Sequence, residues 1–135
     1  MKAFFSKLIV SLILIIISHS SAFSQTLSPT DLKLLIDGQE IKDSTITIEG
    51  LYKIKEITTN FSWLKFNFLV FHWQPRTGFS SVITAQCPGN RLCDDAKNRI
   101  LKHLKPGETI MIEAGESQNS SGHLMKVQDL VLHIQ

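Results

Sequence analysis

The sequence predicts a mostly β domain, a β-sandwich or open barrel of about seven short strands, with one α-helix near residues 94–105. Two observations lead to this fold class. Apolar and polar residues alternate over several short segments, and Gly, Pro or Asp-Gly separate one segment from the next. Between residues 94 and 105, by contrast, apolar residues recur at about every fourth position, which is the spacing of an amphipathic helix.

The first 24 residues contain the three parts of an export signal in the expected order. Lys2 and Lys7 give a positive start, residues 8–17 are almost entirely apolar, and a short tail of mostly small residues follows. A membrane span needs roughly 20 apolar residues, so this run is too short to be one. We therefore predict a signal peptide over residues 1–24, cleaved before Gln25, with an uncleaved anchor as the alternative.

Cleavage would leave residues 25–135 as a single exported domain, periplasmic or secreted. Two of the 14 basic residues lie in the predicted signal peptide, which leaves 12 basic and 12 acidic residues in the mature chain. A nucleic-acid partner requires a cationic surface, which a formally neutral chain does not predict. We expect neither nucleic-acid binding nor membrane insertion after cleavage.

Four strands are predicted in the first part of the domain, at residues 32–37, 39–42, 45–49 and 52–58. Leu32, Leu34 and Ile36 form the inward side of the first strand. Asp37-Gly38 stands between the first two strands, where a two-residue hairpin turn is expected. Alternation in the other two segments predicts strands with one solvent-facing side.

Residues 64–73 give the strongest strand signal, because the segment begins with strict alternation and ends apolar on both faces. This pattern predicts a central strand. Residues 74–78 contain Pro and Gly at turn positions, and a further strand is expected at 79–85.

The predicted helix over residues 94–105 is defined by its apolar side and by its ends. The residues on the apolar side are Ala96, Ile100, Leu101 and Leu104. Asp94 and Asp95 stand at the start, where negative charge favours the helix dipole, and Pro106-Gly107 ends the helix. The two carboxylates could also be an acid–base pair or an ion site, but adjacent helical side chains point apart.

Two strands complete the predicted domain, at residues 109–114 and 124–134, with a turn over residues 117–122 between them. Inward residues alternate regularly in the first of these strands. In the second strand the alternation slips at residues 127–129, which predicts a β-bulge there.

The chain contains two cysteines, Cys87 and Cys93, at the ends of the segment Cys-Pro-Gly-Asn-Arg-Leu-Cys. Pro, Gly and Asn are turn residues that bring the two ends together, and an exported chain meets oxidising conditions. We predict a structural disulfide that adds about 2 kcal/mol by the chain-entropy model. Free thiols, or a redox or metal role, remain as alternatives.

Several segments resemble the C-terminal domain of the GldM family. These are Phe66 to Phe71, the short helix, Lys105 to Glu113 and the terminal segment Leu130 to Ile134, together with the early Leu35-Ile36-Asp37-Gly38. The family belongs to the gliding-motility and type IX secretion machinery of Bacteroidetes. The resemblance covers roughly residues 31–135 and implies a periplasmic β domain that contacts other proteins, here as a stand-alone exported domain. It implies no catalytic residues, and the Cys87 to Cys93 loop does not match the family pattern.

No catalytic, cofactor-binding or metal-binding residues are predicted. The sequence contains no Gly-rich phosphate loop and no nucleophile elbow. No two histidines have the spacing of metal ligands on one helix. The histidines of the mature chain are His72, His103, His123 and His133, and we expect each to be a surface or hydrogen-bonded residue. Asn60-Phe61-Ser62 and Asn119-Ser120-Ser121 match the glycosylation pattern, which we attribute to chance because the resemblance implies a bacterial protein.

Five large apolar residues have an ambiguous position. Trp63, Trp73 and Phe79 lie at or near strand ends, where an aromatic side chain either closes the core or anchors a partner. Leu35 and Leu69 fall on the nominally outer faces of their strands. They predict a second apolar surface, available to a partner or to the helix.

Three functional classes follow from these features. We favour an exported, non-catalytic protein-interaction or structural module that contacts another cell-envelope protein or a second copy of itself. The alternative is a carrier of a small apolar ligand or lipid, with a cavity between sheet and helix. An interior filled by Phe66, Phe68, Ile100 and Leu104 would exclude that cavity. A thiol-redox enzyme or a hydrolase is the third class.

Overall fold

The computed structural model describes residues 32–76 and 81–135. The strands are β1 (Leu34–Ile36), β2 (Thr45–Ile46), β3 (Ile57–Thr59), β4 (Phe68–Trp73), β5 (Ile83–Pro88), β6 (Thr109–Gly115) and β7 (Leu130–Ile134). The helices are α2 (Ile48–Lys53) and α3 (Asp94–Arg99), with 3₁₀ turns η2 (Lys42–Ser44) and η3 (Leu101–His103). The mostly β fold class is therefore confirmed. The predicted signal peptide and Phe79 lie outside the described residues.

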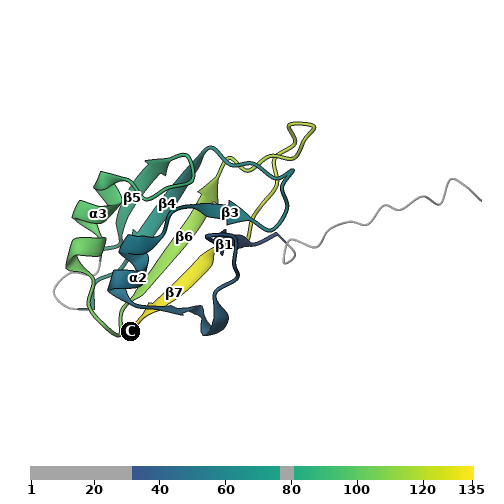
Figure 1. The fold of residues 1–135 in the computed structure, drawn as a ribbon. Coiled ribbons are helices and arrows are strands. Elements are labelled where there is room, and N and C mark those ends of the chain that lie inside the picture. The colour runs from purple at the N-terminus through teal and green to yellow at the C-terminus, as the bar shows by residue number, and fades with distance from the viewer. Residues whose placement is uncertain (1–31, 77–80) are drawn as a thin grey trace, which may run out of the picture.

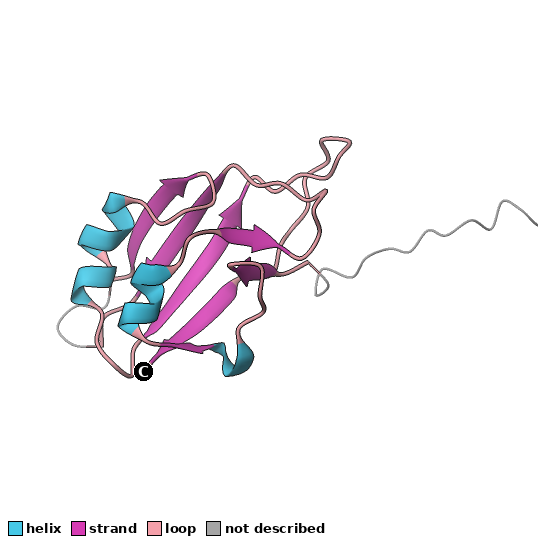
Figure 2. Cartoon of the chain, viewed as in Figure 1, coloured by secondary structure: helices cyan, strands magenta, loops and turns pink. Residues whose placement is uncertain are grey.

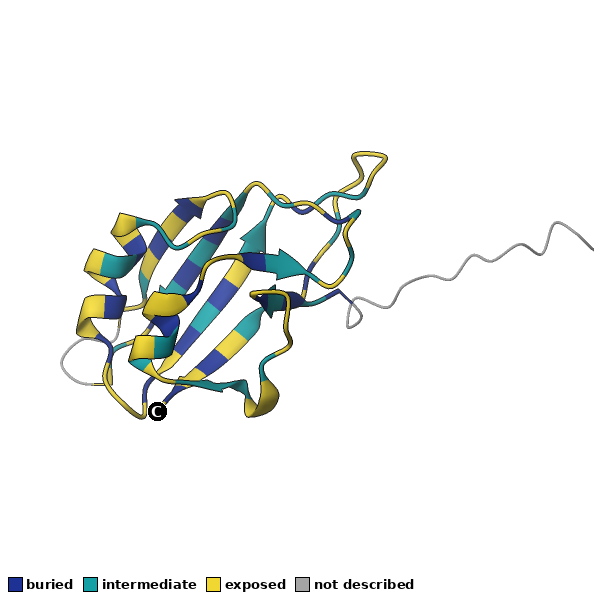
Figure 3. Cartoon of the chain, viewed as in Figure 1, coloured by how far each residue is buried: buried dark blue, intermediate teal, exposed yellow. Residues whose placement is uncertain are grey.

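One five-stranded sheet, in the order β2-β7-β6-β4-β5, forms the back of the domain and does not close into a barrel. Both helices and the two-stranded β1-β3 sheet lie on one face of it (Figures 1 and 2). Buried and exposed residues alternate along β6 and β7, as Figure 3 shows. The hydrophobic core lies between the sheet and this covering layer.

β4 is the central strand that the sequence predicted, with antiparallel β5 and β6 on its two sides. The predicted orientation of its side chains is wrong. Leu69 is fully buried in the core together with Phe71, whereas Phe68 is half-buried on the opposite face. The strand begins only at Phe68, so the alternation read from Leu64 does not continue into it.

The Asp37-Gly38 turn is confirmed. Ile36 and Gln39 exchange two backbone hydrogen bonds of 2.9 Å, and Asp37 and Gly38 have φ angles of 49° and 77°. Positive φ at both positions is the requirement of a type I′ hairpin turn. The predicted partner strand at residues 39–42 is wrong, because β1 pairs along its length with β3.

The predicted strands at residues 45–49 and 52–58 are wrong over 48–53, where the chain forms α2. The Thr47 hydroxyl caps this helix and accepts the Gly50 N–H at 3.0 Å. Glu49 and Lys53 form an ion pair of 2.6 Å one turn apart, and Leu51 is fully buried beneath the helix. Local capping and this buried contact therefore overcome the alternating pattern. The domain has two helices among its described residues, where the sequence predicted one.

The predicted helix at 94–105 is present in a shorter form. The α-helical part ends at Arg99, because Ile100 departs to φ −117° and ψ −68°, and η3 follows. All four predicted inward residues, Ala96, Ile100, Leu101 and Leu104, are buried. At the C-terminal end β6 matches its prediction, whereas β7 starts only at Leu130. The predicted bulge at 127–129 is wrong, because these residues precede β7 and lie outside the strand.

Candidate protein-binding surface

β5 is an edge strand of the five-stranded sheet, with β4 on one side and no other described strand on the other. Gly89 donates its N–H to the Asn67 carbonyl at 2.9 Å, immediately beyond the end of the β4–β5 ladder. In an antiparallel ladder, hydrogen-bonded and non-hydrogen-bonded pairs alternate. The residues of β5 that bond to β4 are therefore Ile83, Ala85 and Cys87. The main-chain groups of Thr84 and Gln86 point away from the sheet.

Pro88 agrees with this alternation. It pairs with Phe68 at a position where the residue on β5 does not bond to β4. The lack of an N–H group in proline therefore removes no hydrogen bond between β4 and β5. Pro88 also removes one donor from the outward edge. The outward main-chain N–H groups of β5 are therefore those of Thr84 and Gln86.

Apart from Pro88 at its end, the outward edge of β5 carries none of the usual devices that prevent strand pairing. Native edge strands are commonly protected by charged side chains, bulges or a covering element. The segment from Val82 to Pro88 has no charged residue, and the side chains of Thr84 and Gln86 are exposed. The disulfide-bonded Cys93 Sγ lies 3.7 Å from the Gln86 carbonyl and has no hydrogen to donate. The main-chain groups of Thr84 and Gln86 find no hydrogen-bond partner in the described part of the chain.

The sheet face opposite the helices is continuous with this edge. Its half-buried residues include Phe68, Val70 and Met111, and no described helix or strand covers it. Val131 is 38% exposed and Val82 is 52% exposed on the same face. Two polar pairs lie between these apolar residues. They are His72 with Glu113 at 3.2 Å and Thr109 with His133 at 3.1 Å. We call this the outer face; it is a mixed surface of modest apolar area.

Phe68 lies across Gly115, its partner on β6. A Cβ atom built on Gly115 would overlap the ring of Phe68. Any residue other than glycine at position 115 would therefore force this ring to move. The ring thereby covers the one residue of β6 that has no side chain.

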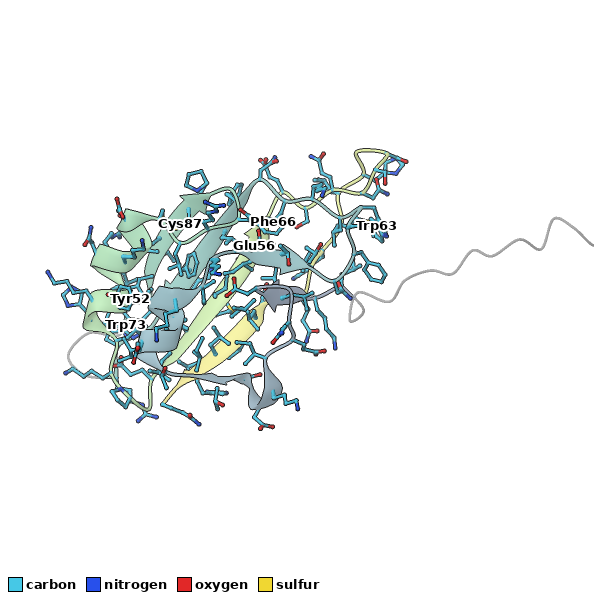
Figure 4. All side chains as sticks on the ribbon, in the orientation of Figure 1. Tyr52, Glu56, Trp63, Phe66, Trp73 and Cys87 are labelled. Atoms are coloured by element: carbon cyan, nitrogen blue, oxygen red, sulfur yellow. A yellow bond between two sulfur atoms is a disulfide. The ribbon has the colours of Figure 1, made fainter. Side chains whose placement is uncertain are left out.

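Cys87 and Cys93 form a disulfide with Cα atoms 5.3 Å apart, as the sequence predicted. Cys87 is fully buried at the end of β5, and Cys93 is the N-cap residue of α3. The bond therefore fixes the end of the edge strand to the start of the helix (Figure 4). Neither sulfur is a free thiol. Disulfides are typical of compartments outside the reducing cytoplasm.

A buried carboxylate holds the other end of β5 and β4 in place. Glu108 is 6% exposed and accepts hydrogen bonds from the Trp73 indole at 3.1 Å and the Lys105 N–H at 2.9 Å. The Arg76 N–H adds a third bond of 3.3 Å. Trp73 is therefore a core residue whose indole N–H is hydrogen-bonded. Of the two interpretations of this residue, closing the core is correct and anchoring a partner is not needed. Trp63 lies at the opposite end of the domain (Figure 4), and its ring packs against the tilted Phe61 ring with the centroids 5.2 Å apart.

A surface cleft of about 610 Å³ lies beside β3 and the segment that precedes β4. Leu35, Phe61 and Phe66 line it, with Lys65 at its rim. Leu35 is half-buried, so the predicted second apolar surface exists here, although Leu69 does not contribute to it. Ile100 and Leu104 fill the space between helices and sheet, whereas Phe66 and Phe68 lie outside that space.

The predicted polar candidates lie apart from one another. His103 stacks on Trp73, and the backbone of His123 bonds to the Asn119 side chain at 3.0 Å. Asp94 and Asp95 pair with Lys97 and Arg99 along α3. Over residues 32–76 and 81–135, no group of three His, Cys, Asp or Glu residues is arranged to hold a metal ion. No helix in those ranges is long and apolar enough to cross a membrane.

Sequence reasoning missed the edge strand as a site. The predicted strand at 79–85 ended too early, so Cys87 was placed in a loop although it lies in β5. The signal was present, because Ile83, Ala85 and Cys87 alternate with three polar or imino residues. Alternation identifies a strand, however, and only its pairing shows that the strand lies at an edge.

Comparison with known proteins gives no match to any family model, any curated protein or any solved structure. The resemblance to the GldM C-terminal domain thus stays a prediction.

Proposed function

We propose that this chain is an exported, non-catalytic protein-binding module of the bacterial cell envelope, periplasmic or secreted. It binds its partner by strand addition at β5. The observation that carries the proposal is the uncharged edge at Thr84 and Gln86, whose main-chain groups have no hydrogen-bond partner among the described residues. In this mode of recognition, main-chain hydrogen bonds supply affinity, and alternate side chains supply specificity.

Two features support this compartment. The predicted signal peptide would direct export, and the Cys87–Cys93 disulfide is typical of oxidising conditions. The resemblance to the GldM C-terminal domain supports the same assignment. It adds the hypothesis that the partner belongs to a gliding or type IX secretion apparatus.

An added strand would meet two different surfaces at β5. Side chains on one side of the added strand would lie beside the exposed Thr84 and Gln86 and so extend the outer face. Side chains on the other side would lie beside the half-buried Ile83 and near α3. The site therefore favours an extended partner segment that is polar on one side and apolar on the other.

Photo-crosslinking in the producing cell tests this proposal. A photoreactive amino acid replaces Gln86 on the edge or, as a control, Lys53, whose side chain is 73% exposed on α2. We expect covalent adducts from position 86 and none of the same mass from position 53. Equal adducts from both positions, or none from position 86, would contradict the proposal.

Thr84→Pro tests whether the contact is a strand addition. The Thr84 N–H points away from β4, so proline there removes a donor from the outward edge and no bond from the sheet. The adduct yield from position 86 is expected to fall about fivefold, the effect of one hydrogen bond of about 1 kcal/mol. Far-ultraviolet circular dichroism checks that this variant folds.

A carrier of a small apolar ligand is the second candidate, and the cleft lined by Phe61 and Phe66 favours it. Titration with a fluorescent fatty acid tests this function. A carrier would show saturable binding that Phe66→Glu abolishes. Binding that Phe66→Glu leaves unchanged would exclude the cleft.

A further inference from the structure

We infer that the strand added to β5 is β5 of a second copy of this chain, in a two-fold symmetric dimer. This inference rests on the proposed function and names the partner of the same edge. The two five-stranded sheets would then form one continuous sheet, joined by an antiparallel β5–β5 pair. Both outer faces would lie on the same side of it, because the two-fold axis is perpendicular to the sheet.

The composition of the edge suits self-pairing. In a symmetric pair of strands the residues around the axis face copies of themselves or of near neighbours. A charged residue would there meet a like charge, which is destabilising. The segment from Val82 to Pro88 contains no charged residue, so this penalty is absent.

Pro88 selects the register of the pairing. With the axis at Thr84, Thr84 faces Thr84 of the second copy, and Val82 faces Gln86 of the second copy. All the outward N–H groups at these positions then have partners, and Pro88 falls outside the paired segment. A shift that places Val82 opposite Pro88 of the second copy would lose one bond for each proline. Both registers form six main-chain bonds within residues 82–88, but only the register centred on Thr84 gives a complete pair of bonds at every paired position.

This register also produces favourable side-chain contacts. Thr84 would meet an identical threonine, and Thr–Thr pairs across antiparallel strands are favourable. Val82, now 52% exposed, would lie against the Gln86 side chain of the second copy. The dimer would thus cover the most exposed valine of the outer face.

The direction of helix α3 determines how the two helices would meet in the dimer. The disulfide places the start of α3 beside the end of β5, and His103 after the helix stacks on Trp73, which pairs with Ile83 at the start of β5. The helix therefore runs opposite to β5, and the two-fold axis would set the two α3 helices side by side and antiparallel.

The charges on α3 are segregated along its length. Its acidic residues, Asp94 and Asp95, precede its basic residues, Lys97 and Arg99, and Lys102 follows in η3. In the antiparallel arrangement the acidic start of one helix faces the basic end of the other. Asp94 is 94% exposed and Arg99 is 54% exposed along their side chains, so both could contact a second copy in addition to their partners within α3.

Analytical ultracentrifugation of the purified chain tests the inference. We expect a reversible dimer whose dissociation constant rises roughly tenfold or more in Thr84→Lys and in Thr84→Glu, because each variant brings two like charges together at the axis. An equimolar mixture of the two variants should recover dimerisation, since lysine then faces glutamate. Thr109→Lys, an exposed change on the same sheet face but on an inner strand, should dimerise like the wild type.

Three outcomes would overturn the inference. A monomer at every concentration excludes the dimer, and a dimer that neither Thr84 variant weakens excludes the β5 interface. Weakening without recovery in the mixture excludes the axis at Thr84. In each case an adduct between position 86 and a different protein in the cell would leave the proposed binding function standing. Circular dichroism confirms that both Thr84 variants fold.

Discussion

Removal of the Glu108 carboxylate should strongly destabilise the domain. This buried side chain is the shared acceptor for three N–H groups, from Trp73, Lys105 and Arg76. Glu108→Ala would leave all three donors without that acceptor. A buried donor that loses its partner costs about 1 to 3 kcal/mol.

The magnitude follows from the burial of each donor. The Trp73 side chain lies in the core, with the residue 6% exposed, so its indole N–H should incur most of the full cost. The Lys105 and Arg76 bonds are only partly buried, and water can replace part of each. We expect a loss of about 3 to 4 kcal/mol in the free energy of unfolding for Glu108→Ala. Glu108→Gln retains one acceptor oxygen and should lose about 1 to 2 kcal/mol.

Urea unfolding monitored by tryptophan fluorescence measures this loss. The midpoint should shift to lower urea while the slope of the transition stays unchanged. Glu113→Ala is the matched control, because Glu113 is 48% exposed and its carboxylate contacts the His72 ring at the surface, so we expect a change of about 0.5 kcal/mol or less. If Glu108→Ala were no more destabilising than Glu113→Ala, the three hydrogen bonds to the Glu108 carboxylate would not stabilise the domain.

Three further changes test other contacts. Reduction of the Cys87–Cys93 bond should lower the free energy of unfolding by about 2 kcal/mol, and a doubly alanine-substituted variant should show no response to reductant in the same urea assay. Gly115→Ala should cost about 1 to 3 kcal/mol because the added methyl overlaps Phe68, and a penalty that persisted in a Phe68→Ala background would refute this cause. Thr47→Ala should cost about 1 kcal/mol through loss of the α2 cap, and an unchanged thermal midpoint would show that the cap contributes nothing.

Strands that bury one side could be predicted from the sequence. β6 is the clearest case, since Ile110 and Ile112 alternate with residues on the outer face and both are fully buried. The same alternation identified the inward residues Leu32, Leu34 and Ile36. A period of two residues leaves little ambiguity where every second residue enters a core.

The segment around α2 could not be predicted in this way. Ile46 and Ile48 have the spacing of a strand, yet β2 ends at Ile46 and the helix begins at Ile48. The deciding contacts are the Thr47 cap and the burial of Leu51 against the core, and the second of these depends on distant residues. A helix of this length has little intrinsic stability and is determined by its packing.

The edge position of β5 could not be predicted from the alternation of residues. Nothing in the residues from Ile83 to Pro88 distinguishes an edge strand from an inner one, apart from the proline at the end. The sheet order and the Gly89–Asn67 bond together show which main-chain groups point outward.

An edge strand that binds a partner must be held in position without help from its free side. β5 has a ladder on one side only, so it depends on contacts at its ends and on the core face. The Cys87–Cys93 bond fixes one end, and Ile83 pairs with Trp73, which Glu108 holds, at the other. Between them Ala85 is 2% exposed in the core. These restraints act from the core face or the ends of the strand, which leaves the main-chain groups of its outer edge aligned and free. A pre-aligned edge costs a partner less conformational entropy than a mobile one, so the same contacts that stabilise β5 would also strengthen binding to it.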